Sequence, residues 1–254
     1  MSRKKIIIGN WKMNKTVSET QGFLRALKKA LPHPLKSTVG VAPSFTSLQA
    51  AIQLTTGTPI KIVAQNVHWK RDGAFTGEIS PTMLKEIGCK TVIIGHSERR
   101  EYFGETNQTI NQKIKCSLEL GMDIIFCVGE KLEDREHGIT EEKIMSQLLE
   151  GVEGVTTSEV KNIIIAYEPV WAIGTGKNAT PEQAEEVHRF IRGCLSKKFG
   201  DKCGMELSIL YGGSVNPDNI PKLSSERNID GALVGGASLN VDSFIAIIKA
   251  VDAT

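Results

Sequence analysis

Residues 162–167 read NIIIAY, and this run is one of a series that decides the fold class. It is nearly all apolar and rich in β-branched side chains, and it does not alternate with polar residues. Such a run predicts a strand that is buried on both faces of a parallel sheet. Similar runs occur at residues 5–9, 38–42, 60–64, 91–95, 124–128, 206–211 and 231–234. We therefore expect eight buried parallel strands.

Amphipathic segments separate these runs and predict helices. Ser18 to Gln21 has the pattern of a capping box, and apolar residues follow at helical spacing. Thr180, Pro181 and Gln183 form a second helix start, with the threonine as N-cap and the proline in the first turn. Strict alternation with eight strands favours a closed (β/α)8 barrel over an open doubly wound sheet, which stays open as an alternative. No linker or composition shift divides the chain, so we expect a single domain over residues 1–254.

The amino-acid composition limits the kinds of binding partner and the cellular location that we expect. The 254 residues are 40% hydrophobic, and 31 basic against 29 acidic residues give a formal net charge of +2. This balance argues against a nucleic-acid or membrane partner. The five cysteines are odd in number and contain no C-x-x-C pair, so they predict neither a disulfide framework nor a zinc site. The first residues do not have the pattern of a secretory signal, and we expect a reducing, cytoplasmic location.

Polar and charged residues follow several of the predicted strands directly. Glu168 comes after the run 162–167, Asn10 and Lys12 after the first strand, and His96 and Glu98 after the fourth. In a barrel of this kind the carboxyl ends of the strands form the working face. A carboxylate base, an imidazole and a cation are therefore expected on one rim.

Each of these residues also has an ordinary structural interpretation. Lys12 alone is as consistent with a solvated surface lysine, and His96 with a core histidine bonded to backbone. Glu98 has Arg99 and Arg100 beside it as ion-pair partners. A serine hydrolase is not indicated, because no serine lies in a G-x-S-x-G turn. The five histidines are scattered without metal-ligand spacing, so we expect no metal.

Glycines after the last two strands indicate contact with an oxyanion. Ser214 follows Gly212 and Gly213, and the pair Gly235-Gly236 precedes a short predicted helix. Without a Cβ atom the backbone can approach a phosphate closely and direct N–H groups at it. The alternative is that both pairs are only tight turns. Residues 169–179, apolar with glycine joints, are typical of a flap that excludes water.

The motifs together resemble the triosephosphate isomerase family. In chain order they are GNWKMN (residues 9–14), GAFTGE (73–78), GHSERR (95–100), CVGE (127–130), AYEPVWAIGTGK (166–177), YGGSV (211–215) and DGALVGGASL (230–239). Seven motifs in family order cover essentially the whole chain. No signature position holds an incompatible residue.

The resemblance implies a barrel that interconverts dihydroxyacetone phosphate and D-glyceraldehyde 3-phosphate without a cofactor, usually as a homodimer. It implies Glu168 as general base, His96 as electrophile, Lys12 as the cation near the substrate oxygens, and Glu98 as support for both. Asn10 would bind substrate, and Gly174, Ser214, Gly235 and Gly236 would hold its phosphate. The segment from Gly73 to Glu78 would insert into the partner subunit. Two rivals are another phosphate-binding barrel enzyme, such as a sugar-phosphate epimerase, and an inactive barrel retained as a scaffold.

Overall fold

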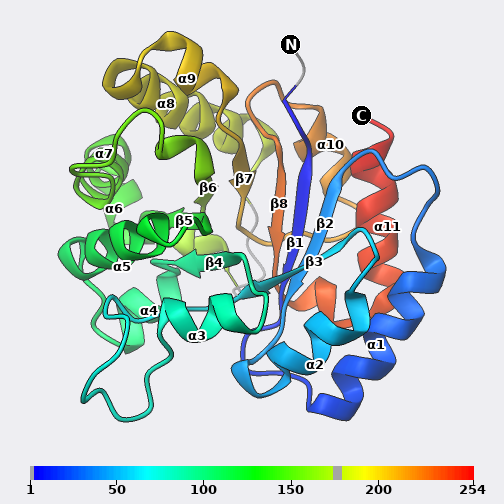
Figure 1. Ribbon diagram of the computed structural model, residues 1–254. Helices are drawn as coiled ribbons and strands as arrows, with labels where there is room; N and C mark the ends of the chain where they lie inside the picture. The colour runs from blue at the N-terminus through cyan, green and yellow to red at the C-terminus, as the bar shows by residue number, and fades with distance from the viewer. Residues whose placement is uncertain (1–2, 174–178) are drawn as a thin grey trace.

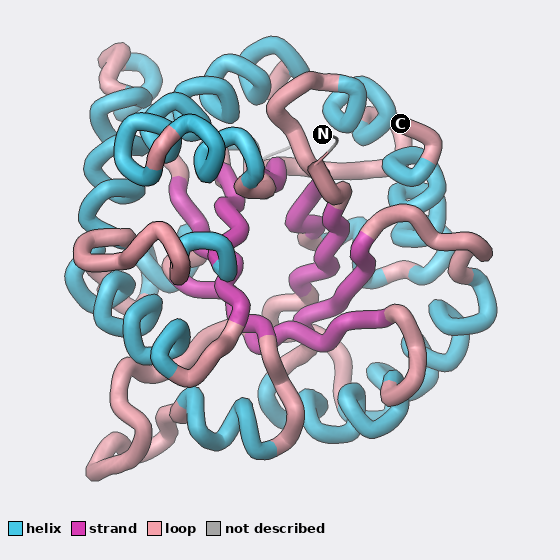
Figure 2. The backbone as a smooth tube through the Cα atoms, turned by 45° about the horizontal axis from the view of Figure 1, so that its top comes forward, coloured by secondary structure: helices cyan, strands magenta, loops and turns pink. Residues whose placement is uncertain are grey.

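Eight parallel strands close into a barrel in the order β1 to β8, with β1 paired to β8. The computed structural model describes residues 3–173 and 179–254. A ring of helices surrounds the ring of strands (Figure 2). The predicted closed (β/α)8 barrel is confirmed, and the open sheet is excluded because it would leave β1 and β8 apart.

The strands are short and lie at the positions of the apolar runs. They are β1 (Ile6–Asn10), β2 (Thr38–Ala42), β3 (Ile60–Ala64), β4 (Thr91–Ile94), β5 (Asp123–Val128), β6 (Ile163–Tyr167), β7 (Ile209–Tyr211) and β8 (Gly231–Val234).

Helices follow the strands and cover the outside of the barrel (Figure 1). They are α1 (Val17–Ala30), α2 (Phe45–Thr55), α3 (Pro81–Glu86), α4 (Ser97–Tyr102), α5 (Asn107–Glu119), α6 (Leu132–Glu136), α7 (Thr140–Gly151), α8 (Pro181–Phe199), α9 (Asp201–Glu206), α10 (Ile220–Ser225) and α11 (Val241–Asp252). The described residues also include the 3₁₀ turns η1 (Val160–Asn162), η2 (Val170–Ala172) and η3 (Gly236–Leu239). Among the described residues no helix is long and apolar enough to cross a membrane.

Two local predictions were wrong. The seventh strand begins at Ile209 rather than at residue 206, because α9 extends to Glu206. The first helix begins after Thr16, not Ser18. The Thr16 backbone N–H donates to the Glu19 carboxylate at 2.7 Å, and the Glu19 N–H donates back to the Thr16 hydroxyl. The predicted cap at Thr180 is confirmed, with Gln183 completing its capping box.

Alternation along the strands separates two apolar layers. Side chains such as Ile7, Val39 and Phe126 belong to the large core between the barrel and the helices. The intervening residues, among them Ile8 and Ile125, pack inside the barrel as a smaller cluster. This register fixes which side chains point into the barrel at either end.

Buried ionic contacts hold the barrel closed between its first and last strands. Asp230 accepts hydrogen bonds from Arg3 at 2.7 Å and from Arg192 at 2.8 Å, so it links the residues before β1 to α8. Gly231 then runs so close to β1 that a Cβ atom would lie 1.9 Å from the Ile6 carbonyl oxygen. Only glycine fits at that junction.

Candidate active site

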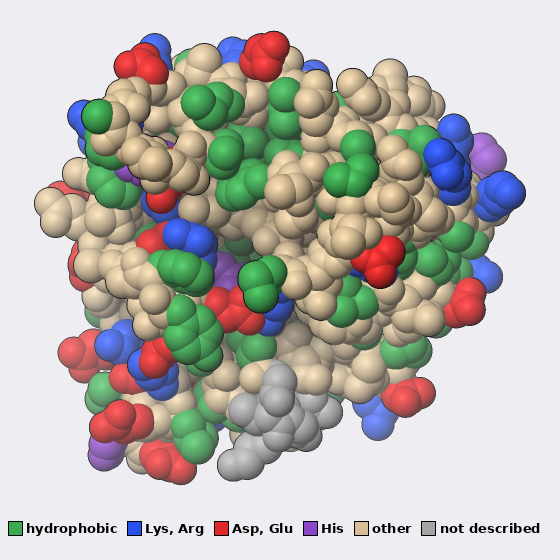
Figure 3. All heavy atoms as spheres, turned by 90° about the horizontal axis from the view of Figure 1, so that it is seen from below, with side chains coloured by type: hydrophobic (Ala, Val, Ile, Leu, Met, Phe, Trp, Pro, Cys, Tyr) green, Lys and Arg blue, Asp and Glu red, His purple; other side chains and the backbone are tan. Residues whose placement is uncertain are grey.

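The predicted catalytic and binding residues meet around one cavity at the carboxyl ends of the strands. It has a volume of about 380 Å³, and its walls include the following predicted residues: Asn10, Lys12, His96, Glu168, Ser214, Gly235 and Gly236. Figure 3 shows this face, with acidic, basic and histidine side chains gathered around its hollow centre. The fold thus brings together residues that are more than two hundred positions apart in the chain.

Glu168 follows β6 and is 2% exposed. Its Oε1 lies 2.9 Å from His96 Nε2, and its Oε2 accepts the backbone N–H of Ser97 at 2.9 Å. Burial on its own raises the pKa of the carboxyl, but the His96 ring and the Ser97 amide outweigh it and hold the pKa below its usual value. The carboxylate is therefore ionised at neutral pH, as a general base must be.

His96 is the N-cap of α4, and this position sets the tautomer of its ring. Nδ1 accepts the backbone N–H of Glu98 at 3.2 Å, which requires that this nitrogen carry no proton. A neutral ring then carries its proton on Nε2, facing Glu168. Burial lowers the pKa of His96, but the Glu168 carboxylate and, to a smaller extent, Glu98 together outweigh burial and raise it. If Glu168 turns away, its negative charge no longer raises the pKa of His96, and burial then favours the neutral ring.

Lys12 lies beyond β1 in a constrained backbone conformation. Its φ is +54°, in the left-handed region that non-glycine residues seldom adopt. The Asn10 side-chain oxygen accepts the Lys12 N–H at 3.1 Å, and Gln65 Nε2 donates to the Lys12 carbonyl oxygen at 2.9 Å. These contacts hold the backbone so that the ammonium group reaches the cavity.

Glu98 pairs with Lys12 rather than with its neighbours in the chain. Lys12 Nζ donates to Glu98 Oε1 at 2.5 Å. The other carboxylate oxygen lies 3.8 Å from His96 Nδ1. Arg99 pairs instead with Glu105, and Arg100 donates to the Gly95 carbonyl oxygen at 2.8 Å. The alternative interpretation of Glu98 as a partner of the adjacent arginines was wrong.

The glycine-rich wall of the cavity forms where β7 and β8 end. Ser214 and Gly235 both line it. The 3₁₀ turn η3 starts at Gly236, where the sequence predicted a short helix. A Cβ atom on Gly213 would lie 2.3 Å from the Tyr211 hydroxyl, so this backbone passes through a space that no side chain can enter. Gly174, which was also predicted to bind phosphate, lies outside the described residues.

The first residues of the predicted flap are fixed to the barrel through a buried carboxylate. Glu130 Oε1 accepts the Trp171 indole N–H at 2.8 Å and the Tyr167 hydroxyl at 3.1 Å. Burial raises the pKa of Glu130. Ile173 reaches the cavity wall. Residues 174–178, which make up much of the predicted flap, lie outside the described residues.

We next compared the sequence with known protein families. The family model described as triosephosphate isomerase matches residues 5–251. The chain belongs to the triosephosphate isomerase family. Curated relatives named triosephosphate isomerase include one from Carboxydothermus hydrogenoformans, which is 54% identical over 97% of this chain and 98% of the relative. Others are from Chlorobium phaeobacteroides, 53% identical over 98% and 99%, and from Dictyoglomus turgidum, 50% identical over 97% and 99%.

Sequence reasoning missed several residues that shape the site of this family member. Gln65 fixes the Lys12 backbone, and the Ser97 amide binds the Glu168 carboxylate. Gly129 lets two strands approach, since a Cβ there would lie 1.7 Å from the Glu168 carbonyl oxygen. The signal for Ser97 and Gly129 was present, because both lie inside quoted motifs. For Gln65 the sequence carried only its place just after a predicted strand.

Proposed function

We propose that this chain is an active triosephosphate isomerase. It interconverts dihydroxyacetone phosphate and D-glyceraldehyde 3-phosphate by proton transfer through an enediolate, as a step of glycolysis and gluconeogenesis. The observation that supports this most directly is the placement of Glu168, His96 and Lys12 in one cavity, with an ionised carboxylate 2.9 Å from the imidazole. A base, a hydrogen-bond donor and a cation are the groups that this reaction needs.

In the proposed mechanism Glu168 removes a proton from the carbon beside the substrate carbonyl and returns it to the neighbouring carbon. Both of its oxygens accept hydrogen bonds in the structure, from His96 and from Ser97. The carboxylate must therefore leave these donors before it takes a carbon-bound proton. That movement frees the Nε2 proton of His96 for the substrate oxygens.

His96 and Lys12 stabilise the charge that develops on those oxygens. The neutral ring donates from Nε2, because the Glu98 amide occupies Nδ1. Lys12 adds positive potential, and Glu98 positions its ammonium group at 2.5 Å. The roles of a glutamate base and a neutral histidine are carried over from the family.

The substrate phosphate is assigned to the glycine-rich wall. Ser214, Gly235 and Gly236 line this wall and are proposed to bind the phosphate through their backbone N–H groups, with Gly174 as a fourth contact. Asn10 lines the same cavity and is assigned to substrate binding. Closure of residues 169–179 would exclude water and prevent loss of phosphate from the enediolate.

We further propose a cytoplasmic homodimer of single-domain subunits. The segment from Gly73 to Glu78 is exposed, and its Phe75 side chain is 40% accessible although its ring centroid lies 4.3 Å from that of His68, with the two rings tilted. Between β3 and α3 the chain projects from the barrel (Figure 1). Met13, beside the active-site residue Lys12, is 96% exposed. Such apolar groups next to a catalytic site fit a subunit interface.

A steady-state isomerase assay tests the proposed function. The purified protein should convert D-glyceraldehyde 3-phosphate to dihydroxyacetone phosphate with and without a chelator. Glu168→Gln should lower kcat by at least about 10²–10⁴-fold, as expected for loss of an acid–base group. Glu136→Gln, which changes an exposed carboxylate, is the matched control.

Three other outcomes would contradict the proposal. Activity that depends on a metal would favour the epimerase-type barrel, and no activity would favour the scaffold. Normal kcat in Glu168→Gln would remove the proposed base.

A further inference from the structure

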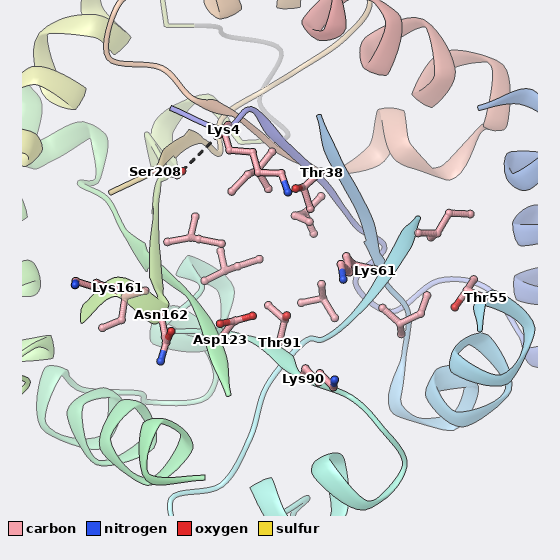
Figure 4. Close-up of a pocket in the computed structure, with 18 of the residues that line it drawn as sticks. Lys4, Thr38, Thr55, Lys61, Lys90, Thr91, Asp123, Lys161, Asn162 and Ser208 are labelled. Atoms are coloured by element: carbon pink, nitrogen blue, oxygen red, sulfur yellow. Dashed lines mark hydrogen bonds between the residues drawn. The ribbon is translucent and has the colours of Figure 1, made fainter. Parts of the chain in front are cut away.

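A second cavity opens at the opposite end of the barrel, where the strands begin. It has a volume of about 550 Å³, against about 380 Å³ for the catalytic cavity. Figure 4 shows side chains from several strands around this opening. None of its lining residues belongs to the proposed catalytic machinery.

Strand alternation places polar side chains at the mouth of this cavity, where they remain exposed to solvent. Ile60 and Ile62 pack against the helices, so Lys61 between them faces the interior of the barrel. Asp123 precedes Ile124, which also belongs to the outer core, and it lies opposite Thr91 in the register of β4 and β5. The first polar layer of the barrel interior is thus built by the strands themselves.

The charges around the opening are mostly positive. Four lysines line the cavity (Lys4, Lys61, Lys90 and Lys161), against two carboxylates (Asp123 and Glu206). In Figure 4, Lys4, Lys61 and Lys90 lie around the opening, Asp123 lies at its edge beside Thr91, and Lys161 extends away from it. Burial raises the pKa of Asp123, while Lys61 and Lys90 act on it in the opposite direction. Within residues 3–173 and 179–254, neither lysine forms an ion pair with this carboxylate.

The common explanation for lysines at this end of a barrel does not cover Lys61. The carboxyl ends of the surrounding helices lie at this end of the barrel and carry partial negative charge, and lysines there often interact with them. Lys61 is part of β3 and faces the barrel interior, so it serves no helix end. Below the charged layer lie Ile6, Ile8 and Ile125, which are buried, and Ile164, which is partly buried. They form an apolar floor that keeps the cavity shallow.

We propose that this cavity binds a small polyol that carries two phosphate groups. The lysines around the opening bind the phosphates from different sides, and Asp123 accepts hydrogen bonds from the polyol hydroxyls. Thr38 and Thr91, which line the same wall, add further hydroxyl partners. The volume lies within the roughly 300–1,000 Å³ of small-molecule sites. The site goes beyond the proposed isomerase function and lies apart from the groups that perform it.

The floor isoleucines provide a local reporter for the experiment. Protein with ¹³C-labelled isoleucine methyl groups is first saturated with 2-phosphoglycolate to occupy the catalytic cavity, and then titrated with glucose 1,6-bisphosphate. We expect the methyl signals of Ile6, Ile125 and Ile164 to shift in a saturable way. Glucose should leave them unchanged, because it lacks the phosphates. Pyrophosphate should bind more weakly, because it lacks hydroxyls for Asp123.

Variants then test the assignment of the lysines. Lys61→Met keeps the aliphatic stem and should weaken binding of glucose 1,6-bisphosphate about tenfold, in line with loss of one charge-assisted hydrogen bond. Lys90→Met should also weaken binding of glucose 1,6-bisphosphate, and it replaces Lys61→Met in the test if that variant fails to fold. Lys28→Met, at an exposed position of α1, should bind as the unchanged protein does. Floor methyl groups that do not shift at millimolar bisphosphate would overturn the proposal, as would equal weakening in Lys28→Met.

Discussion

At the scale of single residues, Glu168 and His96 control each other through one short contact. The 2.9 Å distance from Oε1 to Nε2 holds the carboxylate ionised and raises the pKa of the imidazole. Movement of Glu168 toward substrate removes the charge that favours the protonated ring. In the proposed mechanism, the same motion therefore prepares both the base and the neutral donor.

We expect Lys12→Met to raise KM and lower kcat together. The ammonium group should contact an anionic substrate and its more strongly charged enediolate, so both binding and chemistry lose stabilisation. The loss in kcat/KM should be about 10–100-fold, typical of one charge-assisted hydrogen bond. Steady-state kinetics measure it, with Lys28→Met as control. An unchanged KM would mean that Lys12 is only a surface lysine.

His188 predicts an acid-sensitive component of stability. It is fully buried, its Nδ1 lies 3.2 Å from the Asn228 carbonyl oxygen, and burial lowers its pKa to about 3. The unfolded chain binds a proton near pH 6.5, whereas the folded protein binds it only near pH 3. Between these values the unfolded state holds more protons, so this contribution to the free energy of unfolding falls as the pH is lowered. Its full size is at most about 5 kcal/mol.

We therefore expect His188→Gln to be less stable than the unchanged protein at pH 7, with a difference that shrinks toward pH 4. Urea unfolding at several pH values measures this, with the exposed His137→Gln as control. Parallel curves of stability against pH for the His188 variant and the unchanged protein would contradict the assignment.

At the scale of elements, the close parallel pairing of β5 with β6, continued just past the ends of both strands, positions the proposed base. A Cβ atom at Gly129 would lie 1.7 Å from the Glu168 carbonyl oxygen. The Glu168 N–H donates to the Val128 carbonyl oxygen at 2.8 Å and so continues the pairing of the two strands. The proposed base is held by backbone contact, which side-chain rearrangement cannot relieve.

Gly129→Ala should therefore lower both stability and kcat. We expect a loss of at least about 1–3 kcal/mol, as for overpacked cores. Gly22→Ala is the matched control, because it lies in α1 with nothing within 4 Å of the added methyl group. It should raise stability by about 0.5–1 kcal/mol. Thermal unfolding measures the stability and the isomerase assay measures kcat. A stable, fully active Gly129→Ala would show that the contact between Gly129 and Glu168 tolerates a side chain.

Trp171 should report on the residues that follow β6. Its hydrogen bond to Glu130 lies at the start of the predicted flap. Binding of 2-phosphoglycolate should change the indole environment if that segment moves over the ligand. The change in tryptophan fluorescence should disappear in Trp171→Phe. An unaltered signal in the unchanged protein would indicate a static loop.

The elements differ in how far the sequence predicts them. The eight strands were predictable because burial on both faces leaves continuous apolar runs, as at Ile163–Tyr167. The start of α1 was not, since Thr16 and Ser18 are both chemically suitable caps and only the contact with Glu19 separates them. For a related reason, the sequence left the ion-pair partner of Glu98 open and gave no indication of a role for Gln65. Their partner Lys12 lies far away in the chain and comes close only when the barrel closes.

At the scale of the whole molecule, exposed apolar side chains predict assembly. Phe75 and Met13 lie on the surface beside the catalytic end of the barrel. Light scattering should give twice the subunit mass of 27.7 kDa at micromolar concentration. Phe75→Glu should shift the equilibrium toward the monomer, while Met205→Glu, at an exposed position of α9, should not. An active monomer of the unchanged protein would contradict the proposed dimer.

The pairing of β1 with β8 has a consequence for how the protein is made. During translation the residues of β1 leave the ribosome well before their partners at Gly231–Val234, because the other six strands lie between them in the chain. Until then the growing chain carries an unpaired strand edge, a surface that recruits other chains. It also lacks Asp230, the carboxylate that binds Arg3 and Arg192. Nascent and truncated chains should thus require chaperone protection that the finished barrel does not.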